Sequence, residues 1–207
     1  MTNLTLFLIT TAIFTVSPGP DTIYVMARSL GQGRRAGIIS VLGIGIGLLV
    51  HTVASAVGLS AVLMTSALAY NLVKYVGAGY LIYLGVQIFL SREKHETFKL
   101  MDRSSLTKVF SQGILSSTLN PKLAIFFLAF LPQFVNPSHG RVALQFITLG
   151  SLVTVIGMLW LILVALLTSS IGKWLRRHSR FVQLQQRLTG CILISLGIRL
   201  AIPEQRG

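Results

Sequence analysis

One carboxylate and one ammonium group stand within long apolar stretches of this chain, each directly after a proline. Opposite charges at one site can bind the two ends of a zwitterion through charge-assisted hydrogen bonds, or they can pair with each other. A charge in hydrocarbon costs about 2.5–3.5 kcal/mol on insertion scales, so its presence indicates a functional site. We therefore predict a binding site for a small polar molecule at Pro18, Gly19, Pro20 and Asp21, and at Asn120, Pro121 and Lys122.

Each of these segments is expected to break a helix, because proline has no N–H to donate and its ring clashes with the preceding turn. In lipid, a broken helix is tolerated only where it packs against protein or lines a wet cavity. The half-helix after Pro20 offers unpaired N–H groups and a positive dipole end to a carboxylate. The half-helix before Pro121 offers unpaired carbonyls to an ammonium. Asp21 then holds the ammonium or carries a coupling proton, and Lys122 holds the carboxylate or neutralises Asp21 in the empty site.

Simpler interpretations stay open for the same residues. Asp21 and Lys122 would alternatively form a fixed ion pair that pins two parts of a bundle together, as intramembrane charges commonly do. His51 is the one histidine within a predicted span, and histidine gains and loses a proton near physiological pH. It is therefore a second proton-coupling candidate beside Asp21. The interpretation we favour for His51 is a hydrogen bond to a carbonyl of a neighbouring helix.

The composition is that of an integral membrane protein. Hydrophobic residues make up 53% of the chain and charged residues 11%, against about 25% charged residues in soluble domains. Between Arg35 and Lys74 the chain holds no charged residue apart from a protonated His51. An apolar stretch of at least about 18 residues predicts a transmembrane helix. We expect an all-α integral membrane protein whose outer surface contacts the lipid bilayer.

The apolar runs predict six transmembrane helices in a single membrane domain over residues 1–207, with the first and fourth helices broken at the prolines. A polar loop over about 91–108 separates a first repeat, about 1–90, from a second repeat, about 109–207. The six spans are predicted at about 4–27, 37–64, 72–90, 109–135, 142–171 and 188–202.

The net charge of +13 does not indicate a nucleic-acid partner, because the basic residues cluster in short loops between apolar spans. Most of the 18 lysines and arginines fall in the loops after the first, third and fifth spans, and Arg28 is assigned to the first of these loops. The positive-inside rule places these three loops in the cytoplasm and both termini outside. Cys191 is the single cysteine, so no disulfide, metal cluster or dithiol relay forms within one chain.

The two halves of the chain look like repeats of each other. The first helix of each half is the broken one, and the third helix of each half ends on a similar sequence, Leu81–Val86 and Leu193–Ile198. Because each half has an odd number of spans, the halves must have opposite orientations in the membrane. Inverted repeats with a pair of interrupted helices are typical of secondary transporters whose site lies near the bilayer midplane.

Several short motifs occur in a fixed order along nearly the whole chain. They are Pro18-Gly19-Pro20, Gly33-Arg34-Arg35-Ala36-Gly37, Gly43, Gly47, His51, Tyr80-Leu81-x-x-Leu84-Gly85, Asn120-Pro121-Lys122 and Phe126-Phe127-Leu128-Ala129-Phe130-Leu131-Pro132-Gln133-Phe134. With these motifs the sequence resembles the lysine exporter and homoserine–threonine exporter (LysE/RhtB) family of bacterial inner-membrane proteins. The resemblance implies proton-driven efflux of amino acids or close derivatives across the cell inner membrane. It does not fix the substrate, because members of the family differ in what they export.

Other function classes lack support in the sequence. The chain has no nucleophile elbow, no zinc-protease motif and no second intramembrane carboxylate for acid–base work, so we expect neither an enzyme, a catalytic residue nor a cofactor. Two alternatives to an exporter stay open. One is a membrane scaffold that transports nothing, and the other is an uncoupled channel or uniporter for small polar solutes. The assembly is left open between a monomer and a homodimer.

Overall fold

The computed structural model describes residues 4–17, 19–65, 67–90 and 103–177, together with isolated positions between 187 and 201. Within these residues every regular element is a helix, as the all-α prediction requires. Pro18, residues 91–102 of the predicted polar loop and most of the predicted sixth span lie outside the described residues.

The elements follow one another with few breaks, and α3, a π turn and α4 form one long helix. In chain order the elements are α1 (Leu4–Val16), α2 (Pro20–Gln32), α3 (Arg34–Ala54), the π turn η1 (Ser55–Leu59), α4 (Ser60–Thr65), α5 (Ala67–Leu90), α6 (Leu106–Thr118), α7 (Pro121–Ile125), the π turn η2 (Phe126–Phe130), the 3-10 turns η3 (Leu131–Phe134) and η4 (Pro137–His139), and α8 (Val142–Arg177).

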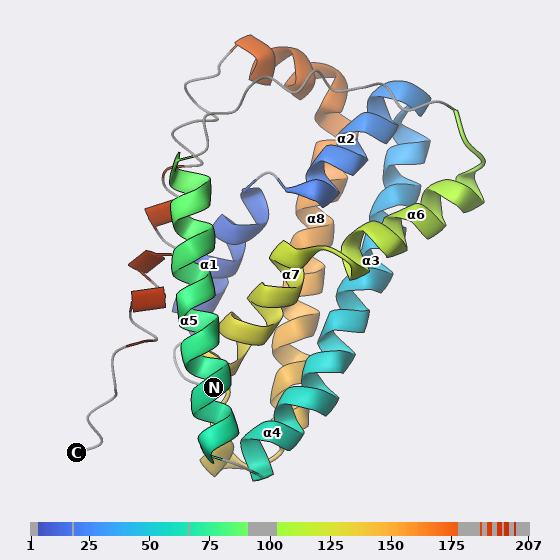
Figure 1. Ribbon diagram of the computed structural model, residues 1–207. Helices are drawn as coiled ribbons and strands as arrows, with labels where there is room; N and C mark the ends of the chain where they lie inside the picture. The colour runs from blue at the N-terminus through green and yellow to red at the C-terminus, as the bar shows by residue number, and fades with distance from the viewer. Residues whose placement is uncertain are drawn as a thin grey trace.

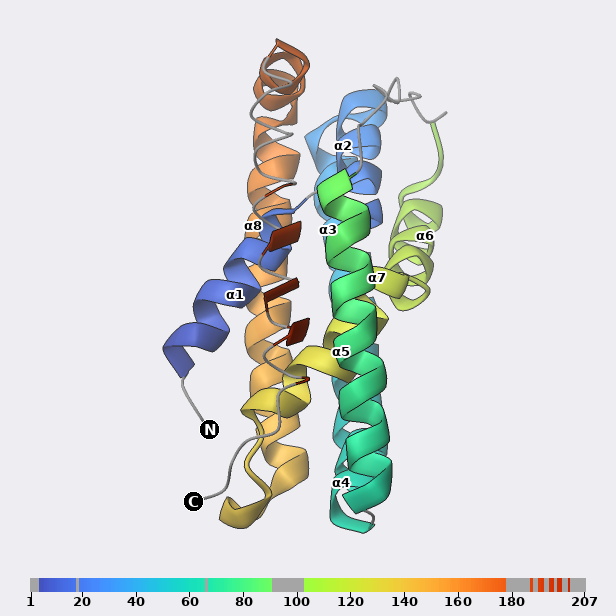
Figure 2. The same cartoon turned by 60° about the vertical axis from the view of Figure 1, so that its left-hand side comes forward.

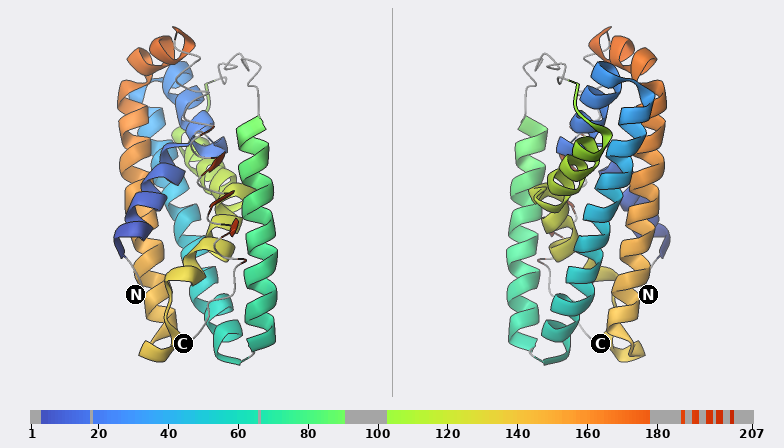
Figure 3. Two further views of the ribbon diagram at one scale, coloured as in Figure 1. Left: turned by 90° about the vertical axis from the view of Figure 1, so that its left-hand side faces the viewer. Right: turned by 90° about the vertical axis from the view of Figure 1, so that its right-hand side faces the viewer.

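The helices form an elongated bundle in which α3 and α8 run side by side in opposite directions (Figure 1). The α3 helix also packs against α6 and α2. The α1 helix leans against α8, and α5 packs against η2 (Figure 2). The α5 and α8 helices lie at opposite edges of the bundle, with α3, α6 and α7 between them (Figure 3). The second half of the first broken helix, α2, packs against α6, the first half of the second broken helix.

Small residues let α3 and α6 approach each other closely. A Cβ atom on Gly43 would collide with Phe110 O, and one on Gly113 would lie 2.7 Å from Ser40 O. On the same face of α3, a Cβ on Gly47 would lie 2.5 Å from the Cβ of Ser117. Glycines at this spacing allow backbones to pack together in membrane helices. The crossing brings the end of α6, and so the second helix break, onto the middle of α3.

Both predicted helix breaks are present. The α1 and α2 helices meet at 49°, and α6 meets the segment Pro121–Phe134 at 44°. Within the described residues, Arg34–Val62 and Val142–Thr168 are each long and apolar enough to cross a membrane. The count of candidate spans rises to four if each bent pair is one span. The arrangement of six spans in two inverted repeats stays a prediction.

The first broken helix ends later than predicted. We assigned Arg28 to a loop after a span that ends near Ala27, which is wrong, because α2 continues to Gln32 and Arg28 is buried, with 3% of its surface exposed. The helix ends at Gly33, whose φ of 89° favours glycine and whose N–H donates to Ser29 O. A hydropathy pattern detects the end of an apolar run, whereas the end of the helix depends on this backbone conformation.

Several helix termini gather at one end of the bundle, and those of α3 and α8 carry arginines in the sequence. The C-terminal ends of α2, α5 and α8 and the N-terminal end of α3 lie toward the top of the view in Figure 1. The helix that begins at Arg34 and Arg35 and the helix that ends at Arg177 are among them. Two basic helix ends on one side agree with the positive-inside rule, and the orientation in the membrane stays a prediction.

Candidate functional site

A small cavity of about 50 Å³ lies between the two helix breaks. Five helices supply its wall. The polar part comes from the breaks and the apolar part mainly from α3 and α8; the lining residues are Phe14, Thr15, Ser17, Gly19, Asp21, Thr22, Ile44, Leu48, Asn120, Lys122, Leu123, Val153, Gly157 and Leu161. A water molecule needs about 10–15 Å³ of such space, so the cavity has room for a few waters in this conformation.

The ammonium of Lys122 lies against the end of α1. Its Nζ donates to Ser17 O at 2.8 Å and to Phe14 O at 3.2 Å, two carbonyls that the helix end leaves without helical partners. The same Nζ lies 4.5 Å from the centroid of the Phe14 ring, within the range of a cation–π interaction. The predicted role of the carbonyls before Pro121, as acceptors for a substrate's ammonium, stays a prediction. The ammonium of Lys122 itself binds carbonyls that lie before Pro20.

Gly19 makes room for this arrangement. A Cβ atom on Gly19 would lie 3.2 Å from Cδ and 3.4 Å from Nζ of Lys122, so the lysine side chain passes directly over the glycine. Gly19 is also the N-cap residue of α2, and it has no side chain to bond the first amides of the helix. Pro20 at the first helical position has no N–H. The first break therefore leaves the amides of Asp21 and Thr22 without a hydrogen-bond partner among the residues that the structure describes.

Asp21 lies in the first turn of α2, where the helix dipole favours a negative charge. The side chain is 8% exposed, and its Oδ1 accepts a hydrogen bond from Ser116 Oγ at 3.2 Å. Asp21 and Lys122 line the same cavity, yet no direct ion pair joins these two described residues. The geometry differs from the fixed ion pair that was one of the predicted alternatives.

The second break is capped by its own side chain. The Oδ1 of Asn120 accepts from Lys122 N at 3.0 Å, and Pro121 occupies the first helical position, where no N–H is needed. Asn120 is buried, with 3% of its surface exposed. The sequence Asn-Pro-Lys therefore starts a helix without help from a ligand, and it aims the lysine side chain at the first break.

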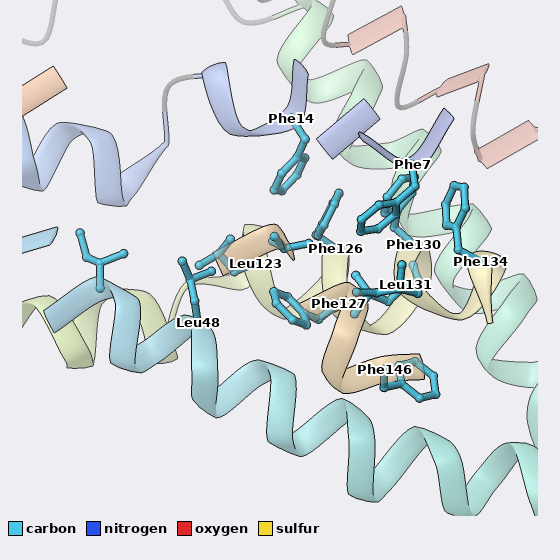
Figure 4. Packing of buried hydrophobic residues seen from close by; sticks show 14 of the residues in the cluster. Phe7, Phe14, Leu48, Leu123, Phe126, Phe127, Phe130, Leu131, Phe134 and Phe146 are labelled. Carbon is cyan, nitrogen blue, oxygen red and sulfur yellow. The ribbon is translucent and has the colours of Figure 1, made fainter. Parts of the chain in front are cut away.

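A column of phenylalanine rings leads away from Lys122 along α1, η2 and η3. Phe14 stacks on Phe126 with ring centroids 4.0 Å apart, and Phe126 stacks on Phe130 at 4.6 Å. Phe130 lies 4.8 Å from Phe134, and Phe7 contacts both of these rings. Figure 4 shows the rings in one row from Phe14 to Phe134. All of these rings are buried, so the interior of the bundle on this side of the cavity is packed with apolar side chains.

His51 lies outside the cavity lining. Its Nε2 is 3.1 Å from Ser117 O, near the end of α6, and its ring stacks on Phe127 with centroids 5.5 Å apart. This is the contact with a neighbouring helix carbonyl that we favoured from the sequence. A role of His51 in proton coupling stays a prediction.

A polar network connects α2 to the beginning of α6 on the other side of the cavity. The guanidinium of Arg28 donates to Gln32 Oε1 at 2.7 Å and to Gln112 Oε1 at 2.6 Å. One helical turn earlier, the hydroxyl of Tyr24 donates to Val109 O at 2.8 Å. The cavity thus lies between this polar network and the phenylalanine column.

The structure brings most of the predicted site residues together. Gly19, Asp21, Asn120 and Lys122 line the cavity, whereas Pro20 and Pro121 start the two half-helices beside it and Pro18 lies outside the described residues. Sequence reasoning missed Phe14, which faces the Lys122 ammonium, and Gly157 of α8, which forms part of the wall. Neither residue differs from its apolar surroundings in sequence, so no local signal marks it.

Comparison with known proteins gives a consistent result. The family model described as LysE type translocator matches residues 12–204. The uncharacterized membrane protein YrhP of Bacillus subtilis is 35% identical over 203 residues, which cover 92% of this chain and 94% of that protein. The homoserine/homoserine lactone efflux protein of Salmonella typhimurium is 30% identical over 195 residues, 94% of each chain. An uncharacterized membrane protein of Vibrio cholerae is 28% identical over 94% of each chain. No solved structure matches the chain.

Proposed function

Because the chain belongs to the LysE type translocator family, we propose that it exports amino acids or closely related small zwitterions in exchange for protons. Members of this family are transporters and not enzymes, and the chain is accordingly a membrane transporter of an efflux family. The name of the Salmonella relative supports the substrate class, since homoserine carries both an ammonium and a carboxylate.

One observation carries the proposal. The two helix breaks face each other across one cavity, and the cavity wall holds a carboxylate, an ammonium and the first-turn amides of α2, which no side chain caps. Discontinuous helices of this kind supply the substrate sites of secondary transporters. A scaffold without transport would have no use for two intramembrane charges, each of which is costly in hydrocarbon.

The substrate carboxylate binds at the start of α2. The amides of Asp21 and Thr22 point out of the first turn, lack partners among the described residues and lie at the positive end of the helix dipole. Oriented amides at a helix N-terminus are a common binding site for anions. At the second break the Asn120 side chain caps the amide of Lys122, whereas no side chain caps either first-turn amide of α2, so we assign the carboxylate to the first break.

Asp21 carries the coupling proton in this proposal. It is the one carboxylate in the cavity wall, and besides the hydrogen bond from Ser116 its two oxygens have further lone pairs that can accept a proton or a cation. Protonation of Asp21 changes the charge of the cavity by one unit. A transporter whose substrate affinity depends on that charge exchanges substrate for protons.

The proposed scaffold is six spans in two inverted repeats in the bacterial inner membrane, with the basic loops in the cytoplasm. A pair of symmetric contacts supports the inverted repeat. A Cβ on Gly85 of α5 would lie 2.8 Å from Gly190 O, and a Cβ on Gly197 would lie 2.8 Å from Ala78 O. The same sequence offset that relates Gly85 to Gly197 also relates Ala78 to Gly190. A two-fold axis between the repeats would therefore convert each of these two contacts into the other.

Counterflow in proteoliposomes tests the function. Vesicles loaded with one unlabelled amino acid from a panel are diluted into its labelled form, with and without a pH gradient. Transient accumulation of label that grows with the gradient is the expected result. Counterflow without any effect of the gradient would indicate a uniporter, flux without counterflow a channel, and no flux for any zwitterion would exclude the proposal.

A further inference from the structure

We propose that the carbonyls of Phe14 and Ser17, together with the Phe14 ring, form an ammonium-binding site that Lys122 fills as a tethered ligand and that the substrate's own ammonium takes over. The inference rests on the proposed function only for the identity of the natural ligand as a zwitterion. It concerns a second part of the same cavity, on the α1 side of the first break.

The site has the composition that a primary ammonium requires. An ammonium has three N–H donors and no acceptor. Lys122 Nζ uses two of them on Ser17 O at 2.8 Å and Phe14 O at 3.2 Å, and it lies 4.5 Å from the centroid of the Phe14 ring. Two carbonyls at a helix C-terminus and an aromatic face would bind any primary ammonium of the same size in this position.

The bonds that hold Lys122 there involve no negative ion. Its Nζ pairs with neutral carbonyls and a ring, whereas the Asp21 carboxylate of the same cavity accepts from Ser116 Oγ. An ammonium from outside can replace Nζ at these carbonyls with no change in the type of bond. The flexible four-carbon stem lets the displaced Nζ move, and Asp21 is the counter-ion that the cavity offers it.

The replacement of Lys122 Nζ by the substrate's ammonium depends on whether Asp21 carries a proton. When Asp21 is ionised, Lys122 can pair with it and leave the carbonyls to the substrate. When Asp21 is protonated, it offers Lys122 no counter-charge, so Lys122 stays on the carbonyls and excludes the substrate ammonium. Proton binding and substrate binding then oppose each other, which is the requirement for antiport.

Removing the tethered ammonium tests this directly. Methionine at position 122 is one heavy atom shorter than lysine and uncharged, so the Lys122→Met variant leaves the Nζ position empty. The probe is n-propylammonium, titrated against the full-length protein in detergent at constant ionic strength, with the rise in unfolding temperature giving the affinity. Charge-assisted hydrogen bonds predict about a tenfold or larger gain in affinity over the unchanged protein.

Two controls define the result. The neutral probe 1-propanol should show no gain, because it brings no charge to the carbonyls. The variant Lys108→Met removes an exposed lysine of α6 and should bind n-propylammonium as the unchanged protein does. If Lys122→Met binds n-propylammonium with unchanged affinity, the role of Lys122 is structural only. If that variant binds a zwitterion more weakly, Lys122 binds the carboxylate of the substrate. Either result overturns the proposal.

A second variant keeps Lys122 in place, in case Lys122→Met does not fold. The change Asp21→Asn removes the counter-ion and should lower the affinity for n-propylammonium, because Lys122 then stays on the carbonyls. An affinity equal to that of the unchanged protein would contradict the exchange. The probe is not an amino acid, so the two proposals can fail separately. If Lys122→Met binds n-propylammonium more tightly but no zwitterion shows counterflow, the ammonium site is supported and the proposed substrate class is rejected. If a zwitterion shows counterflow but Lys122→Met has no gain in affinity, the substrate class is supported and the ammonium site is rejected.

Discussion

The two helix breaks begin in the same way and end up with opposite properties. In each, a proline occupies the first helical position and a charged residue follows it. The second break is closed by the Asn120 side chain, which caps α7. The first has Gly19 in the equivalent position, with no side chain to cap α2. One break is therefore closed by its own side chain and carries Lys122, whereas the other leaves the amides of α2 uncapped and its carbonyls bonded to Lys122. Under the proposed function, this one capping residue distinguishes the structural break from the one that binds substrate.

Replacing the charge of the open break should have the largest effect. The Asp21→Asn variant is expected to reduce export driven by a pH gradient to background while the protein still inserts and accumulates, because asparagine cannot take up the coupling proton. The measurement is efflux from energised cells or vesicles together with the amount of protein in the membrane. Asp21→Glu, which retains a carboxyl group, is the matched control and should keep part of the activity. If Asp21→Asn only lowers the amount of protein, the role in transport is rejected.

Closing the open break should have the next largest effect. In Gly19→Ser the new hydroxyl can accept from the amide of Thr22, as N-cap serines do, and would compete with the substrate carboxylate. A cap bond contributes about 1 kcal/mol, which corresponds to roughly a fivefold rise in KM. The added Cβ also crowds Lys122, since it would lie 3.2 Å from its Cδ. The control Gly79→Ser adds the same side chain where nothing lies within 4 Å. Equal KM values in both variants would refute the assignment of the carboxylate to α2.

Opening the closed break should affect stability more than substrate binding. Asn120→Ala removes the bond from Lys122 N to the Asn120 side chain and is expected to lower the free energy of unfolding by about 1 kcal/mol. Its KM should change less than that of Gly19→Ser. Asn120→Ser keeps an N-cap oxygen and should restore most of the stability. Thermal unfolding in detergent and transport kinetics of the three variants measure both effects, and a KM effect above that of Gly19→Ser would reverse the comparison.

The contact of His51 with the closed break should matter least. Glutamine in place of His51 retains an N–H that can donate to Ser117 O, so His51→Gln is expected to leave the pH dependence of export unchanged. The profile is measured as efflux rate against external pH at a fixed pH gradient. A shift of the profile in this variant would return His51 to the coupling mechanism beside Asp21.

Local physics explains which parts of the fold could be predicted. A proline disrupts a helix wherever it stands, because the missing N–H and the ring clash are properties of the residue itself. The positions of both breaks and of both charges could therefore be predicted from the sequence. That the chain is a membrane protein could also be predicted, because hydropathy is summed over a window of residues. Hydropathy did not give the ends of the helices. Arg28 looked like a loop residue by hydropathy but is buried in α2 and bonded to Gln112 of α6.

The sequence by itself determined that two interrupted helices would bring an Asp and a Lys into an apolar interior. Only the tertiary structure decided what each charge contacts. The carbonyls that bind Lys122 belong to a helix more than a hundred positions earlier in the chain. The crossing of α3 and α6 through Gly43 and Gly113 holds the second break in that position. A partner at such a sequence distance depends on where other helices end and how closely they pack, and no local pattern records either.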